Sequence, residues 1–183
     1  FQYLAIKSAK AVKGEPWRVL VMLSVVTAGI STLLDNVTTV LLIVPVTLVI
    51  TDELKLHPYP FLFTQIFASN IGGTATLIGD PPNIMIGSAV GLTFMDFVIN
   101  VAPVIPLIMF ATFLPLKFIY GNKMQVSEED KKRIMAFRED EAITDSKLLK
   151  QCLFELGIVI LGFFFHGLLH LESATIALFG AAF

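Results

Sequence analysis

The chain has 183 residues, of which 55% are hydrophobic and 15% charged, and its formal net charge is −2. Soluble domains carry about 25% charged residues, so this composition indicates a membrane protein. The near-neutral charge and the lack of a basic patch argue against a nucleic-acid partner, and the single cysteine, Cys152, excludes an internal disulfide and a cysteine metal cluster.

Residues 1–18 are predicted to form an interfacial or cytoplasmic segment. They contain four basic residues and one acid, and their apolar positions indicate a short helix on the membrane surface. The chain starts at Phe1 without a signal peptide and stops within an apolar stretch. We therefore expect it to be a piece of a longer membrane protein.

The apolar run over residues 19–51 is predicted to fold as a re-entrant helical hairpin. Its one ionisable group is Asp35. A spanning helix needs about 20 residues, so the run is too long for one helix and too short for two with a turn. Its middle, "LLDNVTT", contains residues that favour turns and helix caps. Two arms of about 16 residues, each about 24 Å long, would enter the membrane and return to the same side.

A second apolar run, over residues 61–91, is predicted to be a broken transmembrane helix. The stretch "NIGGTATLIGDPPN" places glycines, two prolines and an aspartate at its middle. We expect one half-helix to end at Ile71, an irregular segment over residues 72–83, and a second half-helix to begin at Ile84.

The remaining segments complete an all-α membrane protein. Residues 98–119 are predicted to form a transmembrane helix, and residues 152–171 another. Between them, residues 120–149 read as a charged, solvated cytoplasmic loop with a capped helix start at Ser127. Residues 174–183 begin a further apolar segment.

The basic residues support the hairpin. All 13 Lys and Arg residues fall in three regions, with four in 1–18, one in 52–60 and eight in 117–150. If the run 19–51 returns to its own side, the three regions share one face, as the cytoplasmic excess of positive charge requires. The distribution therefore predicts a multi-pass protein of the plasma or inner membrane.

Each apolar run is interrupted near its middle, by "DNVTT" at 35–39 and by "GGTATLIGDPPN" at 72–83. Unpaired backbone groups are costly in hydrocarbon, so irregular backbone persists there only where protein or a water-filled cavity satisfies it. Half-helix N-termini attract anions, and free carbonyls and C-terminal ends coordinate cations. We therefore expect the two interruptions to meet and to hold an ion or a polar solute.

The candidate binding residues lie in or beside these interruptions. Amides and hydroxyls offer oxygen atoms to a ligand, and glycine lets the backbone approach it. A carboxylate at this depth is itself a functional hypothesis; the alternative is a simple helix cap, which suits Asp35 better than Asp80. The predicted ion- or substrate-binding set is Asp35, Asn36, Thr38, Thr39, Asn70, Gly72, Gly73, Thr74, Thr76, Asp80 and Asn83, with sodium as the candidate metal at Asn36 and Gly73 and no cofactor beyond a coupling ion.

Other chemistry is less favoured by the sequence. His166 and His170 have a spacing that could hold a metal, but no close third ligand is evident. An intramembrane aspartyl protease would need the two acids to face each other and share a proton, whereas the surrounding Thr and Asn residues suit a solute site. An ion channel with filter carbonyls from residues 72–79 stays open as an alternative.

The two motifs resemble those of the ion transporter superfamily, in the branch of arsenical-pump membrane proteins, sodium–proton antiporters and the melanosomal P protein, which share a citrate transporter-like domain. The resemblance is carried by "LLDNVTTVLL" and "NIGGTATLIGDPPN" and covers residues 28–91. The divalent anion–sodium symporters are similar, but they carry Thr or Ser where this chain has Asp80.

The resemblance implies half of an inverted-repeat secondary transporter that is dimeric at full length and moves like an elevator. Residues 152–171 would be the first helix of the second repeat, so the chain should not transport alone. The implied ion site uses Asn36 and the backbone at Gly72 and Gly73, with a tip contact from Thr38 or Thr39. The expected activity is gradient-driven transport and not catalysis. The transported solute would be an inorganic or small organic anion, arsenite or sodium, and its movement would be coupled to a proton or sodium gradient.

Overall fold

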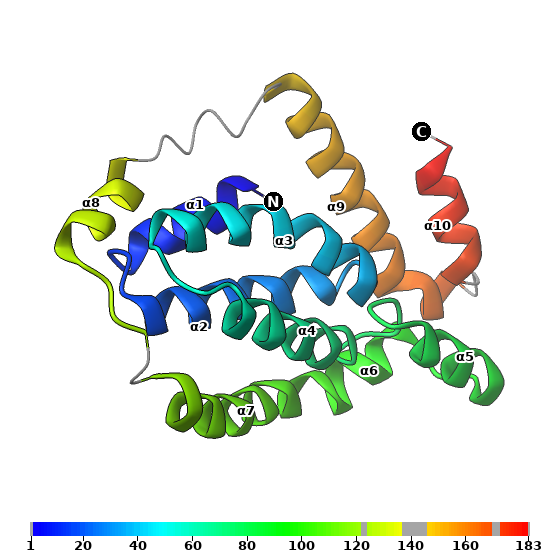
Figure 1. Ribbon diagram of the computed structural model, residues 1–183. Helices are drawn as coiled ribbons and strands as arrows, with labels where there is room; N and C mark the ends of the chain where they lie inside the picture. Colours follow the sequence, from blue (N-terminus) through cyan, green and yellow to red (C-terminus); the bar gives the residue numbers. More distant parts are fainter. Residues whose placement is uncertain (1, 122–123, 137–145, 170–172, 183) are drawn as a thin grey trace.

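A computed structural model describes residues 2–121, 124–136, 146–169 and 173–182. Every regular element in these ranges is helical (Figure 1), which confirms the all-α prediction. The elements are α1 (Gln2–Ala11), α2 (Pro16–Ser31), α3 (Asn36–Glu53), α4 (Tyr59–Gly73), α5 (Pro81–Val90), α6 (Phe94–Asn100), the 3₁₀ helix η1 (Ala102–Val104), α7 (Ile105–Tyr120), α8 (Glu128–Ala136), α9 (Ser146–Leu169) and α10 (Ser173–Ala181).

The first apolar run folds into α2 and α3, helices of 16 and 18 residues that lie side by side (Figure 1). Pro16 opens α2 in its first turn, where the missing N–H costs no hydrogen bond. Asp35 caps α3 because its carboxylate accepts the backbone N–H of Thr38 at 2.9 Å. The chain thus turns back over residues 32–35, where the sequence predicts the turn.

α4 packs against both α2 and α3, and small polar side chains fill the contact. Such residues let helix backbones approach closely inside a membrane. The amide of Gln65 donates to the hydroxyl of Thr47 at 2.7 Å and so ties α4 to α3. The buried polar side chains of the three helices are Ser24, Thr27, Ser31, Thr39, Thr47, Thr51, Thr64, Gln65 and Ser69, each at most 1% exposed.

The second apolar run is interrupted, but the interruption is shorter than predicted. Gly72 and Gly73 complete the last turn of α4, and α5 begins at Pro81, so the irregular segment covers residues 74–80. The difference arises because proline suits the first turn of a helix, so the Pro-Pro pair starts α5 instead of ending the irregular segment.

α6, η1 and α7 follow each other from residue 94 to residue 120. Thr93 and Asp96 form a capping box at the start of α6, with Asp96 accepting the Thr93 N–H at 2.7 Å. The prolines at 103 and 106 lie in the first turns of η1 and α7, where their missing N–H groups are tolerated.

α9 starts at Ser146, earlier than the predicted residue 152, and it packs against α6 and α10. Phe94 of α6 stacks on Phe163 of α9 with ring centroids 5.9 Å apart. A separate apolar core forms around these rings, at the opposite end of the molecule from α8 (Figure 1).

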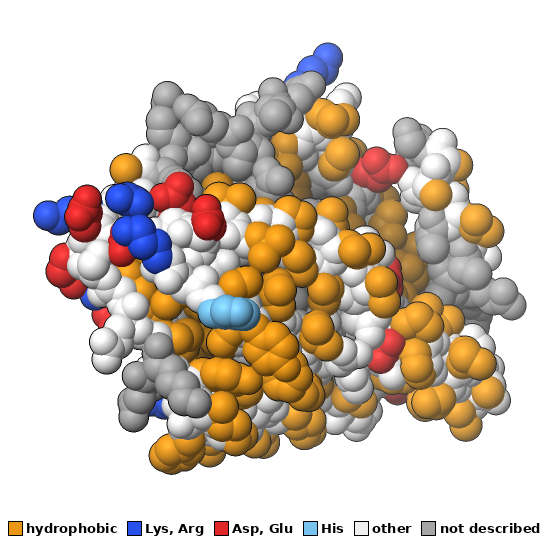
Figure 2. Space-filling view, in the orientation of Figure 1, with side chains coloured by type: hydrophobic (Ala, Val, Ile, Leu, Met, Phe, Trp, Pro, Cys, Tyr) orange, Lys and Arg blue, Asp and Glu red, His pale blue; other side chains and the backbone are white. Residues whose placement is uncertain are grey.

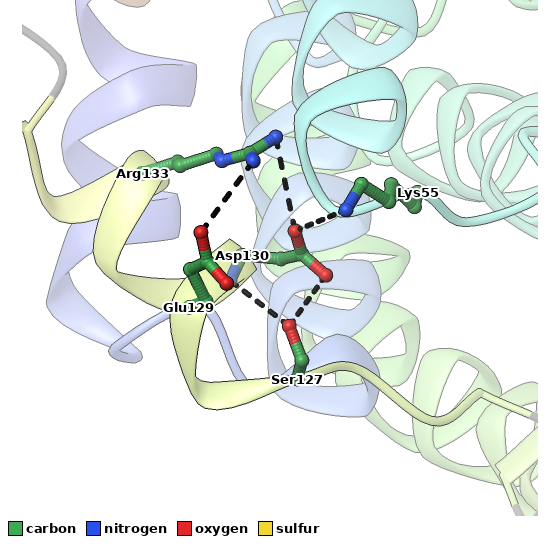
Figure 3. Close-up of polar contacts among 5 residues, drawn as sticks. All are labelled: Lys55, Ser127, Glu129, Asp130 and Arg133. Carbon is green, nitrogen blue, oxygen red and sulfur yellow. Dashed lines mark hydrogen bonds and ion pairs between the residues drawn. The ribbon is translucent and has the colours of Figure 1, made fainter.

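Within the predicted charged loop after α7, residues 128–136 pack on the rest of the molecule more closely than the sequence indicates. This segment forms α8, and Ile134 is fully buried in a core shared with α1, α2 and α3. Asp130 is also buried, its side chain only 7% exposed, and its carboxylate lies 3.0 Å from the ammonium of Lys55 (Figure 3). The sequence did predict the helix start: Ser127 Oγ accepts the Asp130 N–H at 3.2 Å. α8 docks because one buried apolar residue, Ile134, and one buried carboxylate, Asp130, which pairs with the exposed Lys55, lie among its exposed charges.

Both ends of the α2–α3 pair lie beside α8. Gly14, just before α2, approaches Lys131, and Lys55, just after α3, pairs with Asp130. Gly14 and Lys55 have positive φ angles of 65° and 52°. The three basic regions of the sequence therefore contribute residues to one end of the molecule.

Three helical stretches are long and apolar enough to cross a membrane within the described residues: Asn36–Glu53, Phe94–Tyr120 and Ser146–Phe165. Hydrophobic side chains cover most of the face shown in Figure 2, while blue and red side chains gather mainly at the α8 end. Phe118 of α7, for example, is 86% exposed. The chain is an integral membrane protein whose apolar surface gives way to charged side chains at the α8 end.

Candidate functional site

The turn between α2 and α3 meets the interruption between α4 and α5. The hydroxyl of Ser31 donates to the Ser69 carbonyl at 2.7 Å. The hydroxyl of Thr76 donates to the Thr32 carbonyl at 2.5 Å. These bonds join residues more than 35 positions apart in the sequence, and they define the tip–break junction, formed by residues 31–39 and 69–83.

Asn36 and Asn70 connect the two halves of the junction through their side chains. The Asn36 amide nitrogen donates to the Asn70 amide oxygen at 2.7 Å, and the Asn70 nitrogen donates to the Ile66 carbonyl at 2.7 Å. The Asn36 oxygen has no partner among the described residues, so it is available to a ligand. The structure thus brings together two residues that the sequence assigned to the site.

Glycines allow the close approach of the backbones at the junction. A Cβ on Gly72 would overlap the backbone of Ala28 in α2. A Cβ on Gly79 would lie 2.5 Å from the Ser31 carbonyl oxygen and would also overlap Gly73. The backbones of α2 and of the break therefore lie too close together at Gly72 and Gly79 for a side chain to fit between them.

Asn83 points back from α5 into the break. Its amide nitrogen lies 2.9 Å from the Thr76 carbonyl, 3.2 Å from the Thr74 carbonyl and 3.5 Å from the Gly73 carbonyl. Three backbone oxygens of the irregular segment thus converge on one donor. The amide stabilises a backbone that the α-helical hydrogen-bond pattern no longer satisfies.

The predicted threonines fall into different environments. Thr39 is fully buried, and its hydroxyl has no hydrogen-bond partner among the described residues. Thr76 is buried and bonded to Thr32, whereas Thr74 is exposed and its hydroxyl donates to the Asn70 carbonyl. Thr38 is exposed. Thr39 lies one turn from Asn36, on the same face of α3, so its unpaired hydroxyl belongs to the junction.

The two aspartates precede the two helices that start at the junction. Asp35 is the N-cap of α3 and uses its side chain as a cap. Asp80 is the N-cap of α5, but its side chain makes no capping bond. Both are half-buried. The junction therefore contains two helix N-termini, from α3 and α5, and two C-termini, from α2 and α4.

The donor set at the junction suits a hard monovalent cation such as sodium. It consists of amide, hydroxyl and backbone carbonyl oxygens, which hard cations prefer, and the unpaired oxygens of Asn36 and Thr39 are part of it. No sulfur ligand is present, and among the described residues no three His, Cys, Asp or Glu side chains cluster as a metal site. The side chains of His166 and His170, the predicted alternative, lie outside the described residues.

Ser31, Thr32 and Ser69 hold the junction together, yet the sequence interpretation missed them. A signal was present on α2, where Ser24, Thr27 and Ser31 recur at spacings of three and four and so share one helix face. Such a polar stripe inside an apolar run marks the face that packs against another helix.

A protein-family model described as "Citrate transporter" (CitMHS) matches residues 1–182. The chain is 44% identical, over 181 residues, to a protein of Mycobacterium tuberculosis named "Uncharacterized transporter Rv2684". The aligned region covers 99% of the chain and 42% of that relative. A Mycobacterium leprae relative named "46 kDa membrane protein" is 43% identical with the same coverage.

The human protein named "P protein" is 29% identical over 252 residues, covering 99% of the chain and 30% of that relative. The chain thus spans less than half the length of these relatives. The family and the relatives named as transporters indicate transport and not catalysis.

Proposed function

We propose a secondary transport function for the protein that contains this chain, which belongs to the citrate transporter (CitMHS) family. In this proposal the chain supplies half of the solute pathway, and the tip–break junction binds the solute and the coupling ion. The candidate solutes are an inorganic or small organic anion, arsenite or sodium, and the candidate driving gradients are protons and sodium. The chain spans 42% of its mycobacterial relatives, so transport belongs to the whole protein, for which we also propose a dimer.

The observation that carries this proposal is the junction itself. Three hydrogen bonds, Ser31–Ser69, Thr32–Thr76 and Asn36–Asn70, join two irregular segments inside apolar runs. Irregular backbone at membrane depth requires protein or a solute pathway to satisfy it. Here four helix ends and several unpaired oxygens meet, and this combination can bind an anion at helix N-termini and a cation at carbonyl oxygens.

The depth of the junction supports a re-entrant reading of α2 and α3. The turn lies level with the end of α4, and α5 continues beyond it for 10 residues, or about 15 Å (Figure 1). The chain then returns through residues 94–120, a 27-residue stretch about 40 Å long. The turn would therefore stop inside the membrane. α3 is itself long enough to be a candidate span, so labelling of both its ends is the direct test.

Transport is tested with the full-length protein in liposomes, using radiolabelled citrate, phosphate and arsenite under imposed sodium or proton gradients. We expect saturable uptake that follows one of the gradients. Linear flux that does not saturate would indicate the channel alternative instead, and the absence of flux with every probe and gradient would contradict the proposed function.

The role of Asn36 gives a sharper test of the same site. Asn36→Ala removes the bond to Asn70 and a free oxygen, so we expect coupled flux to fall to background while the amount of folded protein stays the same. Asn100→Ala is the matched control, since this exposed asparagine bonds only within α6, to the Asp96 carbonyl. Wild-type transport by Asn36→Ala would remove this residue from the site.

A further inference from the structure

We propose that the aspartates within the two apolar runs have different roles: Asp80 binds the coupling cation, and Asp35 is a structural helix cap. This inference rests on the proposed transport function and deepens it, because it names the charged group of the junction that interacts with the driving ion. From the sequence, both acids are candidate coupling groups and the cap reading suits Asp35 better; the geometry now gives each of them a distinct environment.

Asp35 stabilises the start of α3. One oxygen of its carboxylate, Oδ1, accepts the Thr38 N–H at 2.9 Å, and its backbone carbonyl accepts the Thr39 N–H at 3.0 Å. An N-cap side chain of this kind needs an acceptor oxygen but no charge, since Asn and Ser cap about as well as Asp. Nothing in this geometry requires a cation.

Asp80 is at the corresponding position of α5, but the next residues prevent capping. An N-cap side chain bonds the N–H of the second or third helical residue. The second residue here is Pro82, which has no N–H. The third, Asn83, donates its N–H to the backbone carbonyl of Asp80 at 3.0 Å. Pro82 therefore removes one possible capping donor, and the Asp80 carbonyl uses the other.

The Asp80 carboxylate is thus left without a hydrogen-bond or ion-pair partner among the described residues. It is half-buried, and its neighbour Gly79 is wedged against Ser31 and Gly73 at the centre of the junction. The opposite side of the junction contributes Thr39, whose buried hydroxyl is also unpartnered. Two unsatisfied oxygen groups, one of them anionic, therefore belong to the same junction.

An anionic side chain at membrane depth is costly unless a positive charge neutralises it. No Lys or Arg occurs in residues 19–51 or 61–91, so neither apolar run supplies a positive charge to Asp80. The ligand class that satisfies Asp80 is therefore a small monovalent cation, either sodium or a proton. Binding would neutralise the carboxylate, and this makes the charge of the junction depend on the driving ion.

The test measures cation binding by the purified full-length protein, separately from transport. The melting temperature is recorded in detergent with NaCl against choline chloride, and at pH 8 against pH 6. A rise with NaCl identifies sodium, and a rise on acidification identifies a proton. We expect the wild type to show one of these rises.

Three variants then assign the cation to a residue. Asp80→Asn should lose the cation-dependent rise, and Asp80→Glu, which keeps a carboxylate, should retain it. Asp35→Asn should also retain it, because asparagine preserves the cap. Asp52→Asn, at an exposed acid near the end of α3, controls for the loss of one negative charge. If Asp80→Asn does not fold, Asp80→Ala replaces it as the variant that lacks the carboxylate, and the same loss of the cation-dependent rise is expected.

The proposal is overturned if Asp80→Asn keeps the wild-type cation dependence, if Asp35→Asn loses it together with Asp80→Asn, if Asp80→Glu loses it, or if the wild type has none. Transport failure is distinguishable: a wild type without solute flux but with an Asp80-dependent cation response would contradict the proposed function and leave this inference standing.

Discussion

At the scale of single residues, the junction depends on atoms that glycine and proline lack and that other residues have. Gly72 and Gly79 lack a Cβ, so the backbones of α2 and of the break come into contact. Pro82 lacks an N–H and the Asn83 N–H bonds the Asp80 carbonyl, so the carboxylate of Asp80 makes no capping bond. Both effects depend on residue type: glycine has no side chain to keep the backbones apart, and proline has no N–H to donate.

Gly72→Ala tests the close approach at this scale. The new Cβ would overlap the backbone of Ala28, and since backbone cannot move aside as a side chain can, we expect a loss of about 2–3 kcal/mol, in the range of overpacked cores. The measurement is the melting temperature of the purified protein.

Gly29→Ala is the matched control. Gly29 lies in α2, the helix that packs against α4, and a Cβ at this position would meet nothing within 4 Å. Alanine favours helix over glycine by up to about 1 kcal/mol, so this variant should be as stable as the wild type or more so. Equal stability of the two variants would refute the close packing of α2 and α4.

At the scale of elements, α8 shows how a charged segment becomes part of a core. Figure 3 shows Asp130 between Lys55, Arg133 and Ser127. Lys55 lies in the α3–α4 loop, Arg133 in α8, and Ser127 just before α8. The Lys55–Asp130 pair is the cross-element contact, at 3.0 Å, whereas Arg133 lies 3.8 Å away. A buried carboxylate that loses its cation partner is left uncompensated, so this pair controls the docking of α8.

Asp130→Ala should release α8. We expect faster hydrogen exchange over residues 127–136, because the variant loses both the pair with Lys55 and the bond to Ser127. Glu129→Ala is the control at the neighbouring position, since the Glu129 side chain is 82% exposed and its pair with Arg133 is long, at 3.8 Å. Identical exchange in both variants would mean that the ion pair does not hold the helix.

The docking of α8 should also have a defined pH dependence. The hydrogen bond from Ser127, followed by the contact with Lys55, lowers the pKa of Asp130 below its ordinary value of 3.8. A lowered folded pKa stabilises the docked state above the ordinary value, and this stabilisation is lost as the pH falls through the lowered value. The expected result is that the protection factors of the α8 amides, which compare the measured exchange with the intrinsic rate at each pH, stay unchanged from pH 8 to pH 5 and fall only below 3.8.

At the scale of the whole molecule, separate apolar cores lie at different places along the structure. One core joins α1, α2, α3 and α8 at the charged end, and another joins α6, α9 and α10 at the far end. A smaller core beside the junction, around Ala28, Ala68 and Met109, lies between them. The proposed site therefore lies between the two ends of the molecule.

Single-cysteine labelling of the full-length protein tests this topology. With Cys152 replaced by serine, Glu15→Cys and Asp52→Cys report the base of α2 and of α3, and Leu92→Cys reports the far end; all three positions are exposed. We expect an impermeant thiol reagent to reach the first two from the cytoplasmic side and Leu92→Cys from the outside. Labelling of positions 15 and 52 from opposite sides would eliminate the hairpin, whether re-entrant or spanning.

Much of the local structure was predictable because it follows from short-range rules. The turn at Asp35, the interruption around Gly72 and the cap at Ser127 are signalled by glycines, prolines and cap residues within a few positions. The predictions were less accurate where one rule overlapped another, as at Pro81, which was read as part of the break but starts α5. Docking of α8 was missed because a single buried isoleucine among charges has no periodic signal.

The sequence by itself determined that this is a helical membrane protein with two interrupted apolar runs, because hydrocarbon tolerates only long apolar helices and makes every exception conspicuous. The tertiary structure decided which polar groups meet, since the bonds of Ser31, Thr76 and Asn36 join segments about 40 residues apart. It also sharpened a distinction that the sequence suggests: both aspartates occupy N-cap positions, but the carboxylate of Asp35 accepts the Thr38 N–H, whereas that of Asp80 makes no capping bond.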